Sequence, residues 1–186
     1  MNNPDLDFQT VYEDFQPKIL RYLARLAGEA GAEDLTQEVF IKVNQSLKNF
    51  RGDSSLATWI YRIATNAAFD KLRCRNSSEC LLDGNDEAIP GSEKKPSIEK
   101  QLIRAEMNEC VRGYIEKLPE SYRVVLVLSE YEGLKNSQIT EILGVTLNTV
   151  KIRLHRARAQ LKEELETNCE IHWIEEMPCS VKIPMK

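Results

Sequence analysis

The chain has 186 residues, 42% of them hydrophobic and 29% charged, with a formal net charge of −4 at pH 7. Its length suits one medium domain or two small ones, and its apolar fraction, close to that of globular proteins, excludes a disordered chain. No apolar run approaches the roughly 20 residues that a membrane-spanning helix requires. The acidic N-terminus lacks the apolar segment of a signal peptide, so we expect a cytoplasmic protein. A negative net charge disfavours a nucleic-acid partner at first sight, but binding depends on the local electrostatic field rather than on the net charge.

Apolar residues recur at helical spacing through the first 75 residues, and strand patterns with a period of two are scarce. The first predicted helix includes residues 11–26, and Pro17 marks a kink or a break within it. A second helix buries Leu35, Val39 and Val43, which lie four residues apart. Its outward face then carries Asp34, Gln37, Glu38 and Ile41.

A polar loop at residues 50–56 leads into a third helix, for which Asp53 or Ser54 is the expected N-cap. Along that helix, at residues 58–73, aromatic and basic side chains are interleaved, which is typical of proteins that bind single-stranded nucleic acid. An aromatic stripe at helical spacing is more often part of a core, and we favour that interpretation for Trp59.

The composition changes between residues 76 and 97, where Gly, Ser, Asn and Pro accumulate and large apolar residues are few. This change predicts a flexible linker that would let its neighbours be held together or splayed apart. The expected architecture is all-α, with a small helical domain at 1–75, the linker at 76–97, a second helical domain at 98–165 and a tail at 166–186.

The second domain has the pattern of a helix-turn-helix. Residues 121–131 and 137–143 predict two short helices, and Gly144 supplies the tight turn that requires a positive φ. A longer helix then runs to about Glu164. Two residues can cap it, Thr146 and Asn148.

The longer helix separates two kinds of side chain. One side is apolar and predicts the core, with Val150, Leu154, Ala157 and Leu161. The opposite side carries Lys151, Ile152, His155 and Arg156. Arg153 and Arg158 flank the core stripe, where they could reach DNA phosphates, and residues 149–162 include five Lys or Arg and no acid. Ile152 is misplaced on a solvated face, but in a major groove it could contact a thymine methyl group.

Six motifs stand in order along the chain. In the first domain they are Asp34-Leu-x-Gln-Glu-x-Phe, Phe50-Arg-Gly-Asp-Ser and Thr58-Trp-Ile-Tyr-Arg-Ile-Ala-x-Asn66-x-x-x-Asp70. In the second they are Leu118-Pro-Glu-x-x-Arg123, Glu132-Gly-Leu134 and Gly144-Val-x-x-x-Thr149-Val-Lys-x-Arg-Leu-His-Arg-Ala-Arg158. Over about residues 8–165 the chain thereby resembles the extracytoplasmic-function (ECF) sigma factors, in their conserved regions 2 and 4.

The resemblance implies a promoter-specificity subunit of bacterial RNA polymerase, whose partners are core polymerase, promoter DNA and an anti-sigma factor. Region 2 would read and open the −10 element, and region 4 would read the −35 element. By match to the family, Asp34, Gln37 and Glu38 would dock on the polymerase clamp helices, with Ile41 on the same face. An acidic patch there suits a basic partner surface.

The loop at residues 50–55 matches the family's −10 loop, which holds a base flipped out of the duplex, and Asn66 matches a position that contacts this base. The candidate −10 residues are Phe50, Arg51, Asp53, Ser54, Trp59, Arg62, Asn66 and Arg73. The candidate −35 residues are Thr149, Lys151, Ile152, Arg153, His155, Arg156 and Arg158. The chain departs from the family where Ile152 replaces a small polar residue and where Gln138 and Thr140 replace the more frequent Glu and Ala. These departures bear on which −35 sequence is read, and not on the fold.

The five cysteines, Cys74, Cys80, Cys110, Cys169 and Cys179, are odd in number and include no CxxC pair, which favours reduced thiols. We expect Cys74 and Cys80 to be exposed and Cys110 to lie in the core.

In the tail, Cys169, His172 and Cys179 could supply three metal ligands, or the two cysteines could form a redox pair. We favour the simpler interpretation, an acidic tail with incidental thiols.

No constellation of catalytic residues, phosphate-binding loop or complete metal site is visible in the sequence, so we expect neither enzymatic activity nor a cofactor. The alternative function is a helix-turn-helix regulator that binds duplex DNA without polymerase, with residues 1–75 as an effector or dimerisation module. The outward acidic face and the segment 50–66 argue against it, because a plain regulator needs neither.

Overall fold

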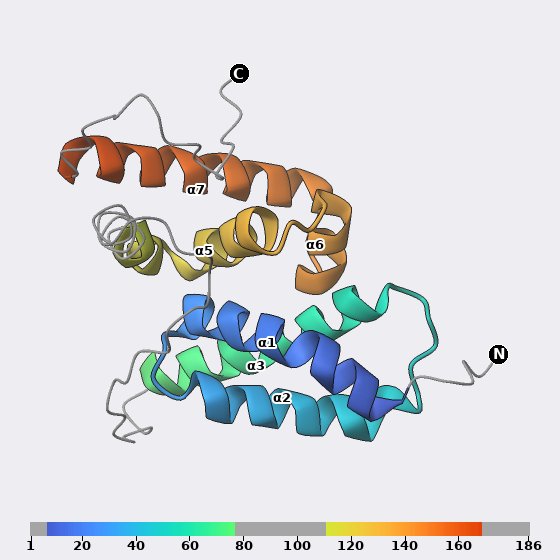
Figure 1. Cartoon of the computed structure of the whole chain (residues 1–186). Coiled ribbons are helices and arrows are strands. Elements are labelled where there is room, and N and C mark those ends of the chain that lie inside the picture. The colour runs from blue at the N-terminus through green and yellow to red at the C-terminus, as the bar shows by residue number, and fades with distance from the viewer. Residues whose placement is uncertain (1–6, 77–110, 169–186) are drawn as a thin grey trace, which may run out of the picture.

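The computed structural model of the chain describes residues 7–76 and 111–168, which are helical almost throughout (Figure 1). The helices, in chain order, are α1 Phe8–Ala27, α2 Ala32–Leu47, α3 Leu56–Asn76, α5 Glu120–Leu126, the π-helical turn η1 Val127–Tyr131, α6 Asn136–Leu143 and α7 Leu147–Asn168. Residues 111–117 are helical as well, and the described residues contain no strand. The predicted all-α fold is confirmed, whereas most of the predicted linker and tail lies outside the described residues.

Helices α1, α2 and α3 pack pairwise and form the first half of the molecule (Figure 1). Their shared core includes the fully buried Ile19, Leu23, Val39 and Ile60. Helix α1 continues through Pro17 as one helix, so the break considered for this position is absent. The proline removes one backbone donor, but buried side chains before and after it hold both parts of the helix on the same core.

The N-terminus of α3 is capped by Ser55, and not by Asp53 or Ser54 as expected from the sequence. The Ser55 hydroxyl oxygen accepts a hydrogen bond from the backbone N–H of Thr58 at 3.1 Å. An N-cap side chain must reach the N–H group two or three residues ahead, and the helix begins at Leu56, directly after Ser55. Asp53, Ser54 and Ser55 are adjacent polar residues, and each could serve as the N-cap.

The second half contains the predicted helix-turn-helix. Helix α6 ends at Gly144, whose φ of 63° is left-handed as the tight turn requires. The Thr146 hydroxyl oxygen then accepts from the backbone N–H of Thr149 at 3.2 Å and caps α7, as predicted. Helix α7 extends beyond Glu164 to Asn168, and an ion pair between Lys162 and Glu166 at 3.5 Å spans this added turn.

The two halves pack on each other. Helix α6 lies against α3, and η1 lies against α1, so that buried residues of both halves form one connected cluster. The predicted linker is compatible with two domains that pack together or lie apart, and in the structure the two halves pack together.

A buried hydroxyl pair joins α1 to α3 within the first core. Tyr22 and Thr65 are completely buried, and their side-chain oxygens lie 2.7 Å apart. Thr65 donates to the carbonyl oxygen of Tyr61 at 2.6 Å, so the Tyr22 hydroxyl is the donor to Thr65. Burial raises the pKa of Tyr22 well above its usual value, and the phenol stays protonated.

We expect Thr65→Val to lower the free energy of unfolding by about 1–3 kcal/mol, because it leaves the Tyr22 hydroxyl buried without its partner at nearly constant volume. Urea denaturation measures this change. In the double variant, Tyr22→Phe should recover part of the loss, since both partners are then removed. Additive losses in the double variant would contradict the coupling.

Candidate nucleic-acid interface

Helix α7 presents an exposed arc opposite its buried stripe. Val150, Leu154 and Ala157 are buried, as predicted. The exposed arc, defined here as the side chains that project to solvent on the other side, consists of Lys151, Ile152, His155 and Arg156. Ile152 is 44% exposed and is the apolar member of this charged surface. The arc combines two cations with one apolar contact point.

Other candidate residues of α7 have partners within the protein. Arg158 donates from Nε to Oε1 of Glu130 at 3.1 Å, which holds the guanidinium against η1. Thr149 is half-buried beside Thr146, with the two hydroxyl oxygens 2.8 Å apart. The structure therefore separates these two residues from the exposed arc.

Arg153 and Arg156 differ in their surroundings. Arg153 is half-buried and lines an open hollow with Phe69 of α3 and Glu120 of α5. Arg156 is exposed, and its Nη1 donates to the hydroxyl of Tyr122 at 3.3 Å. Arg153 is thus partly enclosed, mostly by residues of its own half, whereas Arg156 is exposed to solvent.

Four candidate −10 residues share one face of α3. With 3.6 residues per turn, the spacing of Trp59, Arg62, Asn66 and Arg73 aligns them along the helix. Arg62, Asn66 and Arg73 are exposed, and Trp59 is half-buried. Arg73 lies 3.9 Å from Asp70, an exposed pair that constrains the arginine little.

The loop before α3 rests on an aromatic pair. The rings of Phe50 and Trp59 are tilted, with centroids 5.1 Å apart. Trp59 packs against the core, as favoured from the sequence, yet keeps part of its surface in solvent. Arg51 and Asp53 are exposed, and Ser54 is half-buried. The loop therefore combines exposed polar side chains with a half-buried aromatic pair.

The outward face of α2 is as predicted. Asp34, Gln37, Glu38 and Ile41 are all exposed, and Ile41 is 57% exposed. Asp34 lies in the first turn of α2 together with Glu33, and Glu38 follows about one turn later. A surface that combines an exposed apolar side chain with carboxylates is complementary to a protein partner whose binding surface has basic residues at its edge.

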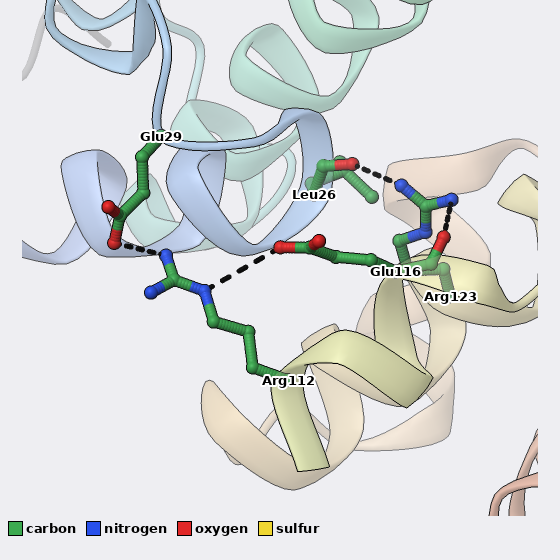
Figure 2. A network of polar contacts seen from close by, with 5 residues as sticks. All are labelled: Leu26, Glu29, Arg112, Glu116 and Arg123. Carbon is green, nitrogen blue, oxygen red and sulfur yellow. Dashed lines mark hydrogen bonds and ion pairs between the residues drawn. The ribbon is translucent and has the colours of Figure 1, made fainter. Parts of the chain in front are cut away.

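Arg123, in α5, bridges the two halves, a role that sequence reasoning missed. Its Nη1 donates to the carbonyl oxygen of Leu26 at 3.0 Å, in the last turn of α1, and its Nη2 donates to the carbonyl oxygen of Glu116 (Figure 2). The same Nη2 donates to the carbonyl oxygen of Leu118 at 3.2 Å. Beside it, Arg112 pairs with Glu29 across the halves. The guanidinium satisfies a carbonyl that the end of a helix leaves without an intrahelical donor.

Glu132, which follows η1, is the second bridge. Its Oε2 accepts from the hydroxyl of Tyr61 on α3, and its Oε1 lies 3.7 Å from Nη1 of Arg25 on α1. The Arg25 guanidinium also stacks over the Tyr131 ring, 4.5 Å from its centroid. Burial raises the pKa of Glu132, and the Tyr61 bond and nearby arginines oppose this shift. Arg123 and Glu132 belong to the quoted motifs, but no local pattern pointed to partners so distant in sequence.

Among the remaining sequence candidates, Cys74 is exposed on α3 as expected. Cys80, Cys110 and the tail candidates Cys169, His172 and Cys179 lie outside the described residues. Within residues 7–76 and 111–168, no group of three or more His, Cys, Asp or Glu side chains could hold a metal ion. In the same residues, no helix combines the length and the apolar character needed to cross a membrane.

Comparison with known proteins matches both halves of the chain to family models. Residues 11–78 match the model of Sigma-70 region 2, and residues 108–161 match that of Sigma-70, region 4. Among solved structures, the sigma factor RpoE of Bartonella quintana, in complex with the anti-sigma factor NepR, has a TM-score of 0.69 at 21% identity and covers 87% of this chain and 98% of its own. CnrH, in complex with the cytosolic domain of CnrY, has a TM-score of 0.62 at 20% identity, with 87% and 88% covered. These structures share the fold.

Curated relatives match along most of their length. The sigma-H factor of Pseudomonas aeruginosa is 36% identical over 166 residues, covering 86% of each chain. SigZ of Bacillus subtilis is 31% identical over 170 residues, covering 89% of this chain and 91% of its own. The ECF sigma-E factor of Escherichia coli is 31% identical over 165 residues, with 86% of each covered. The chain therefore belongs to the ECF group of the sigma-70 family, the sigma factors that direct promoter-specific transcription.

Proposed function

We propose that α2 docks this sigma factor on core RNA polymerase, that α3 and its preceding loop bind the opened −10 element, and that α7 reads the −35 element. The observation that carries the proposal is the exposed arc of α7. Its cations and Ile152 project to solvent from a helix whose opposite side is fixed in the core by Val150 and Leu154. A rigid helix with an outward basic face fits the major groove of DNA.

Within the arc, the side chains have different tasks. Lys151 neutralises a phosphate, which strengthens binding to any sequence. Arg156 makes the bidentate contact to guanine that arginine geometry favours, and Ile152 contacts a thymine methyl group. Arg158 acts indirectly, because its bond to Glu130 fixes α7 against η1.

The exposed stripe of α3 binds the −10 strand once it is opened. Extruding a base costs a few kcal/mol of stacking, and a preformed pocket offsets this cost. The Phe50–Trp59 pair provides an apolar floor for such a base, and Asn66 offers an amide for its polar edge. Arg62 and Arg73 on the same face attract the phosphates.

The protein supplies recognition and carries out no reaction of its own, and it acts in the cytoplasm. Both similar structures were solved with an anti-sigma factor or a partner's cytosolic domain. We extend this to the present chain and propose an anti-sigma factor as its regulator.

Run-off transcription tests the proposed function as a whole. Core polymerase should initiate from a subset of a promoter library only when this chain is added. Initiation without promoter selectivity, or none at all, would contradict the proposal.

Substitutions in the exposed arc should separate specific from general contacts. Arg156→Ala should lose about 1–3 kcal/mol of discrimination at one base pair of the −35 element, because it removes a bidentate contact. Lys151→Ala should weaken binding to all duplexes to a similar extent and flatten the salt dependence. Fluorescence anisotropy with single-base duplex variants measures both, and Gln160→Ala, exposed further along α7, is the control. Equal behaviour of Arg156→Ala and Lys151→Ala contradicts the assigned roles.

Substitutions on α2 should affect polymerase binding alone. The double variant Gln37→Ala/Glu38→Ala should weaken binding to core polymerase, because it removes charge and hydrogen-bonding groups from the docking face. Its affinity for an isolated −35 duplex should match that of the unmodified chain. The matched control is Gln9→Ala/Glu13→Ala on α1, an exposed pair whose side chains bond to each other at 2.6 Å. If the control weakens polymerase binding as much, α2 is not the docking face.

A further inference from the structure

Arg156, the arginine proposed to contact a base, is bonded to a tyrosine of a neighbouring helix. Its Nη1 donates to the hydroxyl oxygen of Tyr122 in α5, and the two atoms are 3.3 Å apart. We propose that Tyr122 is a positioning residue for −35 recognition, whose hydroxyl orients the Arg156 guanidinium toward the base pair that this arginine reads. The inference rests on the proposed function, because it concerns how the exposed arc of α7 makes its specific contact.

Tyr122 can orient a neighbour because its own position is fixed. It lies in the first turn of α5, where its backbone N–H donates to the carbonyl oxygen of Pro119 at 2.8 Å. Its ring is half-buried and packs against the hydrophobic core. A tyrosine side chain has only two χ angles, so a ring held by the core leaves the hydroxyl little freedom. Because α5 packs against α7, this hydroxyl is a nearly rigid acceptor beside the exposed arc.

The Tyr122 hydroxyl orients Arg156 without neutralising its charge. Arg158, on the same helix, provides the contrast, because its guanidinium is paired with the carboxylate of Glu130. None of the ion pairs formed within residues 7–76 and 111–168 involves Arg156. Hydrogen bonds from a charged donor are stronger than those between neutral groups. A neutral partner therefore keeps the full positive charge of Arg156 available for DNA.

The bond to Tyr122 also leaves free the edge of the guanidinium that a guanine requires. An arginine has five N–H donors in a planar fork, and the Tyr122 hydroxyl engages one of them, on Nη1. The N–H of Nε and one N–H of Nη2 point in parallel from another edge of the same plane. Two parallel donors match the O6 and N7 acceptors that guanine presents in the major groove. Tyr122 thus favours the orientation in which this edge of Arg156 meets the base.

Restricting the side chain before DNA binds lowers the entropic cost of recognition. A free arginine samples many rotamers, and it loses this freedom when it makes a bidentate contact. Arg156 is exposed, so its own helix restricts it little. The bond to Tyr122 limits the rotamers in advance, and less entropy is lost when the correct base pair is met. The effect is confined to the base pair that Arg156 reads, because Tyr122 acts through this one side chain.

Affinities of the full chain for −35 duplexes that differ by single base pairs test this role. Tyr122→Phe removes the hydroxyl and keeps the ring in the core. It should lower discrimination about two- to fivefold at the base pair that Arg156→Ala affects, and leave discrimination at the other positions unchanged. In the Arg156→Ala background it should have no further effect, because the two residues act as one unit. Fluorescence anisotropy measures the affinities, and Tyr12→Phe, an exposed tyrosine on α1, is the matched control.

Three results would overturn the positioning role of Tyr122. An equal loss of affinity for every duplex would mean that the hydroxyl binds a phosphate itself or supports the fold. Additive effects of Tyr122→Phe and Arg156→Ala would mean that the tyrosine does not act through the arginine. Discrimination that is unchanged in Tyr122→Phe but lost in Arg156→Ala would reject the positioning role and leave the proposed function intact. Unchanged discrimination in Arg156→Ala would count against the proposed function as well, so the two failures are distinguishable.

Discussion

Helix α3, of 21 residues, has three faces with different surroundings. One stripe, with Ile60 and Ala64, is buried against α1 and α2. A second stripe, with Tyr61 and Phe69, faces the other half of the molecule. A third, with Asn66, is exposed and belongs to the proposed −10 surface. The rest of the structure depends on this division, because the surface that anchors the second half lies beside the surface proposed for DNA.

The formal charge of −4 is a sum over surfaces of opposite character. The docking face of α2 is acidic, and the exposed arc of α7 is basic. Between them, the Arg25–Glu132 and Arg112–Glu29 pairs join the halves. Each binding surface therefore carries a local field that the net charge conceals.

The elements and their exposed faces could be predicted because they follow from local rules. The period of the apolar residues in α2 and α7 fixes which side is buried, and Gly144 and Thr146 fix the turn and cap of the helix-turn-helix. The choice of Ser55 over its neighbours as N-cap could not be predicted, since three adjacent polar residues could each serve.

The packing of the halves could not be predicted either. Arg123 meets the carbonyl oxygen of Leu26 across 97 positions of sequence, and Arg158 meets Glu130 on a different helix. Helical periodicity places a side chain on a face, but says nothing about which distant group meets it there. The sequence predicts that Arg158 can reach a phosphate, and the structure places its guanidinium on the carboxylate of Glu130.

The central claim is that the exposed arc of α7 reads the −35 element. Run-off transcription by core polymerase with the unmodified chain or with Arg156→Ala, on promoters that differ by single base pairs, measures this directly. We expect Arg156→Ala to lose discrimination at one base pair of the −35 element and to retain it at every position of the −10 element. Unchanged discrimination at every position of the −35 element would contradict the claim.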